Sequence, residues 1–158
     1  MNKLIAVIRV RGLVNRKSKI EKTLKMLRLY KKHTCTLVPN TSSLVGMLKE
    51  VQDYVTWGEI DEKTLKNLLT KKGKLAGKIK FTEDYLKEKT KLDTDTFVKE
   101  LLELKKKLKD VPGLKSFFKL APPIKGFERK GIKKPFSLGG ALGYRKEKIN
   151  ELLGRMIY

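Results

Sequence analysis

The first 60 residues constrain the fold of this chain most strongly, because they alternate twice between strand-type and helix-type hydrophobic patterns. The first segment, Leu4–Val10, is a short apolar run rich in β-branched residues, which is typical of a buried strand. In its second half Ile8 and Val10 fall on one side of the predicted strand. Arg9 and Arg11 fall on the other side, so the pattern predicts a strand with a basic end.

Four more elements are predicted before residue 60. Apolar residues recur at helical spacing behind the capping-box pair Ser18 and Glu21. The predicted elements are a helix over residues 19–31, a strand over Cys35–Val38, a second helix capped within residues 40–42 and a third strand over Tyr54–Trp57. The resulting order is β-α-β-α-β.

Residues 61–110 are expected to be mainly helical. Apolar spacing predicts helices over residues 61–73, 82–89 and 94–109. A glycine-broken basic stretch at 71–80 separates the first helix from the other two and indicates a hinge. Acidic and basic residues nearly balance over much of the part that follows, which is typical of a solvent-facing helix with ion pairs rather than of a binding site.

Residues 111–158 form a basic region rich in glycine and proline. A short strand is expected at 116–120, and the apolar spacing from Ile149 to Met156 predicts a terminal helix that packs back onto the core. The chain is therefore expected to contain a core domain, a helical appendage and a basic extension, at residues 1–60, 61–110 and 111–158.

The segment 125–144, the extension loop, carries five glycines, five basic residues, three aromatic residues and only one acid, Glu128. Twenty residues of loop are uncommon in a compact domain unless they are functional or disordered. One interpretation is a plain surface loop whose aromatic side chains pack into the core. We favour a segment that becomes ordered on RNA, because glycines permit close approach, cations neutralise phosphates and aromatic rings can stack on bases.

The charge of the chain points to a polyanionic partner. The 158 residues contain 38 Lys and Arg against 17 Asp and Glu, a net charge of +21, and the pI is about 10.0. Nucleic acid is the usual partner of such a protein. A membrane is not indicated, since no apolar stretch approaches the roughly 18–20 residues of a spanning helix. The short apolar run near the N-terminus lacks the features of a signal peptide, so the cytoplasm is the expected location.

The residues required for most catalytic and metal sites are missing from the sequence. His33 is the only histidine and Cys35 the only cysteine, so neither a normal metal site nor a cysteine–histidine pair is expected. Cys35 lies in an apolar run and is expected to be buried. The Gly140–Gly143 spacing is a weak match to nucleic-acid clamps, and no nucleotide-binding loop occurs. No enzyme, cofactor or small-molecule substrate is indicated.

Two blocks of sequence carry a family resemblance. They are LVPNTSSLVGMLKEVQDYVTWGEID with RVRG in front of it, and the C-terminal Pro-Pro, Lys-Lys-Pro-Phe, Gly-Gly and Leu-Gly-Tyr-Arg elements. Together they resemble the large-subunit ribosomal protein of the L-thirty family, called L-seven in eukaryotes, in its archaeal form. The resemblance implies an α+β fold with a ferredoxin-like β-α-β-α-β core and a small mixed sheet. It also implies a structural constituent of the large ribosomal subunit whose partners are large-subunit rRNA and neighbouring large-subunit ribosomal proteins.

The candidate RNA contacts are basic residues with few acids around them. They are Arg9, Arg11, Arg16 and Lys17 in the core, and Lys119, Lys125, Arg129, Lys130, Lys133, Lys134 and Arg145 in the extension. Two other functions stay open at this point. One is a free-standing nucleic-acid chaperone or DNA-compacting protein, and the other is an accessory RNA-binding subunit of an RNA-processing complex.

Overall fold

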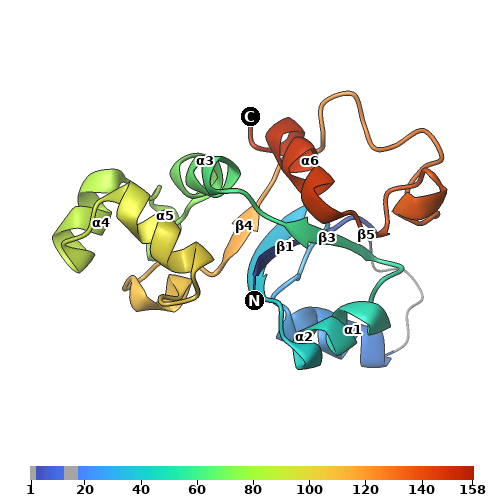
Figure 1. Ribbon diagram of the computed structural model, residues 1–158, viewed down its shortest axis with the longest axis horizontal. Coiled ribbons are helices and arrows are strands. Elements are labelled where there is room, and N and C mark those ends of the chain that lie inside the picture. The colour runs from blue at the N-terminus through green and yellow to red at the C-terminus, as the bar shows by residue number, and fades with distance from the viewer. Residues whose placement is uncertain (1–2, 13–17) are drawn as a thin grey trace.

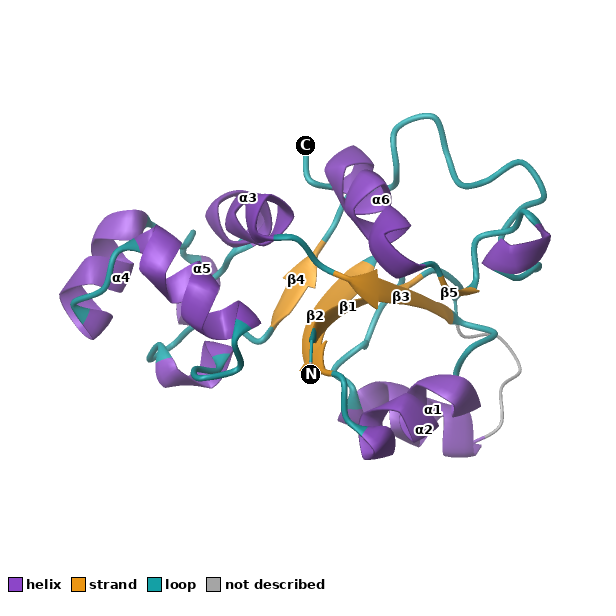
Figure 2. Cartoon of the chain, in the orientation of Figure 1, coloured by secondary structure: helices purple, strands orange, loops and turns teal. Residues whose placement is uncertain are grey.

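A five-stranded mixed sheet forms the centre of the molecule (Figures 1 and 2). The computed structural model describes residues 3–12 and 18–158, and only the backbone of Lys78. The strands are β1 (Leu4–Arg9), β2 (Thr34–Pro39), β3 (Val55–Glu59), β4 (Phe117–Lys119) and β5 (Gly143–Tyr144), in the order β4-β2-β1-β3-β5. Among the five described strands, only β5 pairs in parallel, with β3; the other pairings are antiparallel. The predicted α+β fold with a ferredoxin-like core is confirmed.

The central strand β1 is buried along its whole length, so both faces of the sheet need a covering layer. Helices α1 (Ser18–Met26) and α2 (Ser42–Glu50) cover one face, where Ile5 and Val7 pack in a cluster with residues of both helices. Helices α3 (Glu62–Lys72) and α6 (Ile149–Met156) lie on the other face (Figure 2). There Leu4, Ala6 and Ile8 join the larger of the core clusters.

Helix α1 ends five residues earlier than predicted. The expected helix extended to residue 31, but α1 ends at Met26 and Arg28 has a left-handed φ of 58°. In a continuous helix Tyr30 would lie on the buried face and Leu29 beside it. In the structure Leu29 is fully buried and Tyr30 is 49% exposed. The physical reason is a C-terminal cap of the Schellman type: the Leu29 amide donates to the Leu24 carbonyl at 2.9 Å and the Arg28 amide to the Lys25 carbonyl at 3.0 Å. The carbonyls of Leu29 and Tyr30, beyond the helix, accept hydrogen bonds from the Arg9 side chain.

The last helix of the appendage is shorter than the sequence predicts. The α4 and α5 part of the appendage lies at one end of the molecule (Figure 1). Beyond α3 the appendage contains α4 (Glu83–Thr90) and α5 (Thr94–Leu102), whereas the helix that begins at residue 94 was expected to run to residue 109. Leu104 has a φ of 59°, a left-handed conformation that ends the helix. A short 3-10 turn, Leu108–Asp110, follows.

The hydrophobic core is continuous from the sheet into the appendage. Ile8 of β1, Leu65 of α3 and Phe97 of α5 belong to the same cluster of buried residues. Cys35 is also in this cluster, as predicted, and burial raises the pKa of its thiol to about 12. Within the described residues, no helix is both long and apolar enough to cross a membrane.

Gly58 of β3 provides a test of how the C-terminal region packs on the sheet. A Cβ at this position would lie 2.0 Å from the carbonyl oxygen of Lys146, so Gly58→Ala must displace the chain before α6. We expect it to lower the free energy of unfolding by about 1–3 kcal/mol, the usual cost of overpacking, measured by urea denaturation. Gly46→Ala in α2 is the control. It has no heavy atom within 4 Å of the new Cβ, and it should be neutral or stabilising by up to about 1 kcal/mol.

Candidate nucleic-acid interface

The structure separates the candidate RNA contacts into buried and exposed residues. Arg16 and Lys17 lie outside the described residues. Of the remaining nine candidates, two are buried and one is half-buried. The exposed ones are Lys119, Lys125, Arg129, Lys130, Lys133 and Lys134.

Arg9 is only 1% exposed and is not available to a phosphate, so the predicted basic end of β1 is wrong at this position. Its guanidinium donates hydrogen bonds to the carbonyl oxygens of Leu29 at 2.7 Å and Tyr30 at 2.9 Å, and its Nε donates to the Arg11 carbonyl at 3.0 Å. The alternation along the strand correctly predicted that Arg9 and Ile8 lie on different faces of the sheet. It did not predict that Arg9 is buried, because α1 and α2 cover that face too.

Arg145 is also buried, with a side chain that is 1% exposed, so the prediction that it contacts RNA is wrong at this position too. It links the extension loop to the core. Its Nε donates to the Thr56 hydroxyl of β3 at 2.8 Å, and its Nη2 donates to the Ala141 carbonyl at 2.8 Å. Its Nη1 pairs with the Glu128 carboxylate at 2.7 Å, and the guanidinium lies 4.8 Å from the centre of the Phe136 ring.

The extension loop has a defined conformation that its own hydrogen bonds maintain. The Phe136 amide donates to the Leu142 carbonyl at 2.7 Å, and the Ala141 amide donates to the Gly131 carbonyl at 3.1 Å. Gly140 is required by space, since a Cβ there would lie 2.1 Å from the Lys134 carbonyl oxygen. The structure therefore differs from the expectation that this segment is ordered by RNA: its order comes from contacts within the chain.

Five exposed cations project from the extension loop with no acidic partner among the described residues. They are Lys125, Arg129, Lys130, Lys133 and Lys134. Glu128, the only acid of the loop, is already paired with the buried Arg145 and lies 3.7 Å from Arg155. The positive potential of the loop is therefore uncompensated, as an anion-binding surface requires.

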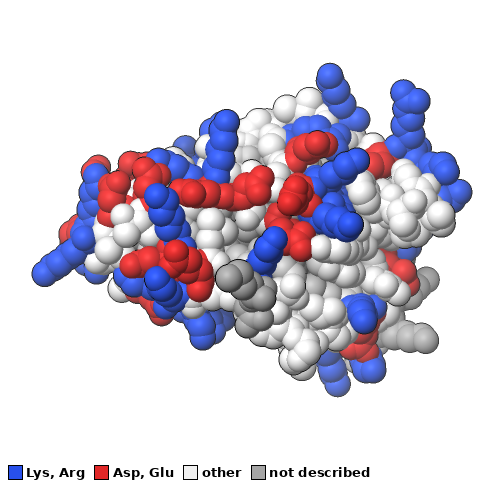
Figure 3. Space-filling view, in the orientation of Figure 1, with Lys and Arg blue, Asp and Glu red and all other residues white. Residues whose placement is uncertain are grey.

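The appendage carries the opposite arrangement. Five of its lysines pair with acids at short range, as in Lys87–Asp93 at 3.1 Å and Lys106–Glu100 at 3.0 Å. Figure 3 shows acidic and basic side chains interleaved over the α4 and α5 end, and mainly basic ones over the end that carries the extension loop. The ion pairs predicted for residues 81–110 are therefore present.

The basic face of α1 is also partly neutralised, which the sequence did not indicate. Lys19 pairs with Glu50 of α2 at 2.6 Å, and this hydrogen bond raises the pKa of Lys19 while lowering that of Glu50. Lys25 pairs with Glu21 at 3.2 Å. Glu50 comes from a different helix, so only the folded chain brings it to this face.

The two remaining candidates lie on the core. Arg11 is half-buried; its guanidinium donates to the Asp53 carbonyl at 3.1 Å and lies 5.3 Å from the centre of the Tyr54 ring. Lys119 is exposed on β4, the edge strand opposite β5. These cations therefore extend the candidate interface from the extension loop onto parts of the core.

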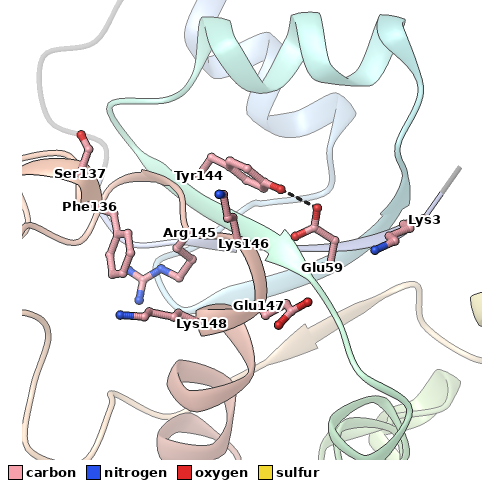
Figure 4. Close-up of a pocket in the computed structure, with 9 residues that line it drawn as sticks. All are labelled: Lys3, Glu59, Phe136, Ser137, Tyr144, Arg145, Lys146, Glu147 and Lys148. Atoms are coloured by element: carbon pink, nitrogen blue, oxygen red, sulfur yellow. Dashed lines mark hydrogen bonds between the residues drawn. The ribbon is translucent and has the colours of Figure 1, made fainter. Parts of the chain in front are cut away.

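A surface pocket of about 560 Å³, which sequence reasoning missed, lies beside β5 (Figure 4). Its lining includes Lys3 near the start of β1, Glu59 of β3 and Tyr144 of β5, so only the fold brings these residues together. The Tyr144 hydroxyl donates to the Glu59 carboxylate at 2.5 Å. This hydrogen bond is the main reason that the pKa of Tyr144 is raised to about 12.

No cluster of three or more potential metal ligands occurs among the described residues. The single histidine, His33, stacks on Phe127 with ring centroids 6.0 Å apart, and burial lowers its pKa. His33 therefore serves packing at the base of the extension loop.

The fold defines the class of the protein as an α+β domain with a ferredoxin-like core and a mixed sheet. The family model described as ribosomal protein L30p/L7e matches residues 5–55, which include most of β1 and all of α1, β2 and α2. The protein named large ribosomal subunit protein uL30 from Nanoarchaeum equitans is 50% identical over 154 residues, covering 98% of this chain and 99% of that protein.

Two further relatives carry the same name. The one from Methanococcus vannielii is 49% identical over 152 residues, covering 96% of this chain and 98% of the relative. The one from Methanopyrus kandleri is 46% identical over 149 residues, covering 94% of this chain and 100% of the relative. The chain therefore belongs to the ribosomal protein L30p/L7e family.

Removing the carboxylate of Glu128 tests whether Arg145 anchors the extension loop. In Glu128→Ala the guanidinium stays buried without its counter-ion, so we expect the free energy of unfolding to fall by roughly 1.5–3 kcal/mol in urea denaturation. The control is Glu151→Ala on α6, whose side chain is exposed; it should change stability by less than about 0.5 kcal/mol. Equal stability of the two variants would contradict the anchoring role.

Proposed function

We propose that this protein is a structural constituent of the large ribosomal subunit and that it binds large-subunit rRNA. The observation that carries the proposal is the near full-length identity of 46–50% to archaeal proteins named large ribosomal subunit protein uL30. The uncompensated cations of the extension loop supply a physical means of binding a polyanion. Neighbouring large-subunit ribosomal proteins are the other proposed partners.

The proposed mechanism is electrostatic. Exposed lysines and arginines neutralise phosphates of folded RNA and release the counter-ions that surround them, which supplies most of the affinity. The backbone of the extension loop is already in place, so little ordering entropy is lost when it binds. Selection then depends on the shape of the RNA more than on base sequence.

The three parts of the chain have different proposed roles. Residues 1–60 form the scaffold with Arg11 at its surface, and residues 111–158 supply most of the RNA contacts. Residues 61–110, in which five lysines are paired with nearby acids, are proposed to extend the subunit surface rather than to bind phosphate. The proposed location is the cytoplasm, on the ribosome, and the proposed role involves no catalysis, cofactor or small-molecule substrate.

Sedimentation at moderately high salt tests the function directly. A lysate of the source organism is separated on a sucrose gradient, and the chain is followed by antibody. We expect it to migrate with the large subunit at a salt concentration that removes loosely bound basic proteins. Release into the light fractions would instead favour a free nucleic-acid chaperone, and migration with an enzyme complex without ribosomes would favour an accessory RNA-processing subunit.

The extension loop can be tested by replacing Lys130, Lys133 and Lys134 together with alanine. We expect weaker binding to large-subunit rRNA, and a slope of log affinity against log salt that is smaller in magnitude by up to about 3, one for each lost phosphate contact. The measurement is a filter-binding titration at several salt concentrations.

The matched control replaces Lys63, Lys91 and Lys99 of the appendage region, which are exposed and have no acidic partner within the described residues. It removes the same charge, so its salt slope should stay close to that of the unmodified protein. An identical change in both triple variants would mean that net charge, not the extension loop, determines binding.

A further inference from the structure

The pocket beside β5, which we call the Tyr144 pocket, is not explained by phosphate binding alone. Tyr144 is 46% exposed, although its side chain contacts other residues of the chain. Its hydroxyl is held by Glu59, and the Trp57 ring lies next to it with the two centroids 6.4 Å apart. An exposed aromatic ring held on two sides is a stacking surface that loses little entropy when a planar group binds.

Cations and carboxylates line the same pocket, and Figure 4 shows Glu59 and Lys146 beside the Tyr144 ring. Lys3, Lys146 and Lys148 are exposed, and among the described residues none of them has an acidic partner. Two carboxylates, Glu59 and Glu147, also line the pocket. Phosphate is attracted by the first set and repelled by the second, so a ligand with one anionic end and one hydrogen-bond-donating end matches the lining.

A nucleotide has this combination of groups. Its base offers a planar face to an aromatic ring and N–H groups to carboxylate oxygens, and its phosphates pair with lysines. The volume of about 560 Å³ lies within the range of sites that hold one small molecule. An acidic protein segment fits less well, because the two carboxylates would repel it.

We propose that the Tyr144 pocket receives a single unpaired nucleotide of the bound RNA, with its base stacked on Tyr144 and its phosphate against Lys146 and Lys148. The inference rests on the proposed rRNA-binding function and adds to it a site that reads an extruded base. Phe136 is not the stacking surface, because the guanidinium of Arg145 lies over its ring. The pocket adjoins the extension loop through Phe136 and Ser137, so the nucleotide continues the phosphate-binding surface.

The first test uses the unmodified protein, so it does not depend on how a variant folds. Trp57 is the only tryptophan of the chain and lies beside Tyr144. Titration with large-subunit rRNA should quench its fluorescence, and ultraviolet cross-linking should attach a nucleotide to the peptide that contains Tyr144. A cross-link pattern confined to other peptides, with unchanged Trp57 fluorescence, would overturn the proposal.

The second test compares substitutions of Tyr144 in rRNA titrations. Tyr144→Ala should weaken binding roughly tenfold, the usual size of one lost base stack, with an unchanged salt slope because no phosphate contact is removed. Tyr144→Phe keeps the ring and should bind within about twofold of the unmodified protein. The control is Tyr158→Ala, which removes a 59% exposed tyrosine that also lies beside a lysine, Lys72, and should leave the affinity unchanged.

The possible outcomes distinguish a failure of the nucleotide-pocket proposal from a failure of the proposed rRNA-binding function. Unmodified protein that fails to bind rRNA would overturn the proposed function. Tight rRNA binding by the unmodified protein and by Tyr144→Ala alike would overturn only the pocket. The Tyr144→Ala protein could also bind purified rRNA normally and yet be missing from assembled subunits. That result would overturn the nucleotide assignment too, because it would mean that the pocket binds a neighbouring protein.

Discussion

The buried guanidinium of Arg145 is the interaction on which the functional end of the molecule depends. It joins Thr56 of the central sheet to Glu128 and Ala141 of the extension loop, and it covers the Phe136 ring. A buried cation must be paired and hydrogen-bonded, and each of its partners is therefore held in place. The loop is kept on the core by this requirement together with its own backbone hydrogen bonds.

The same interaction determines the electrostatics of the surface. Glu128 is the one carboxylate that could neutralise the extension loop, and it is directed inward to Arg145. Five cations are thereby left facing solvent, whereas five lysines of the appendage pair with nearby acids. The net charge of +21 is thus not spread evenly over the molecule. A basic end suited to phosphate lies on one side of the sheet, and a nearly neutral end lies on the other.

Local patterns predicted much of the fold. The strands β1 to β3 and the helices α2, α3 and α6 lie where hydrophobic periodicity placed them. The errors occur where a distant group replaces a local one. Helix α1 ends early at a left-handed Arg28, and the carbonyls of Leu29 and Tyr30 just beyond it bond to Arg9 of β1. Strand β5 was missed because a two-residue strand forms only when β3 is beside it. The Tyr144 pocket could not be predicted, since its lining comes from three separate parts of the chain.

The sequence by itself determined the order of elements, the excess of positive charge and the family, because these depend on residue identity and on spacing over one or two turns. Only the tertiary structure decided which cations face solvent. Arg9 and Arg145 carry the same side chain as the other arginines, yet they are buried because the fold brings to them acceptors that lie 20 and 89 residues away in the sequence. Lys133 and Lys134 have no such acceptors within the described residues and stay exposed. Burial of a charge depends on what the fold brings to it, and no local pattern contains that information.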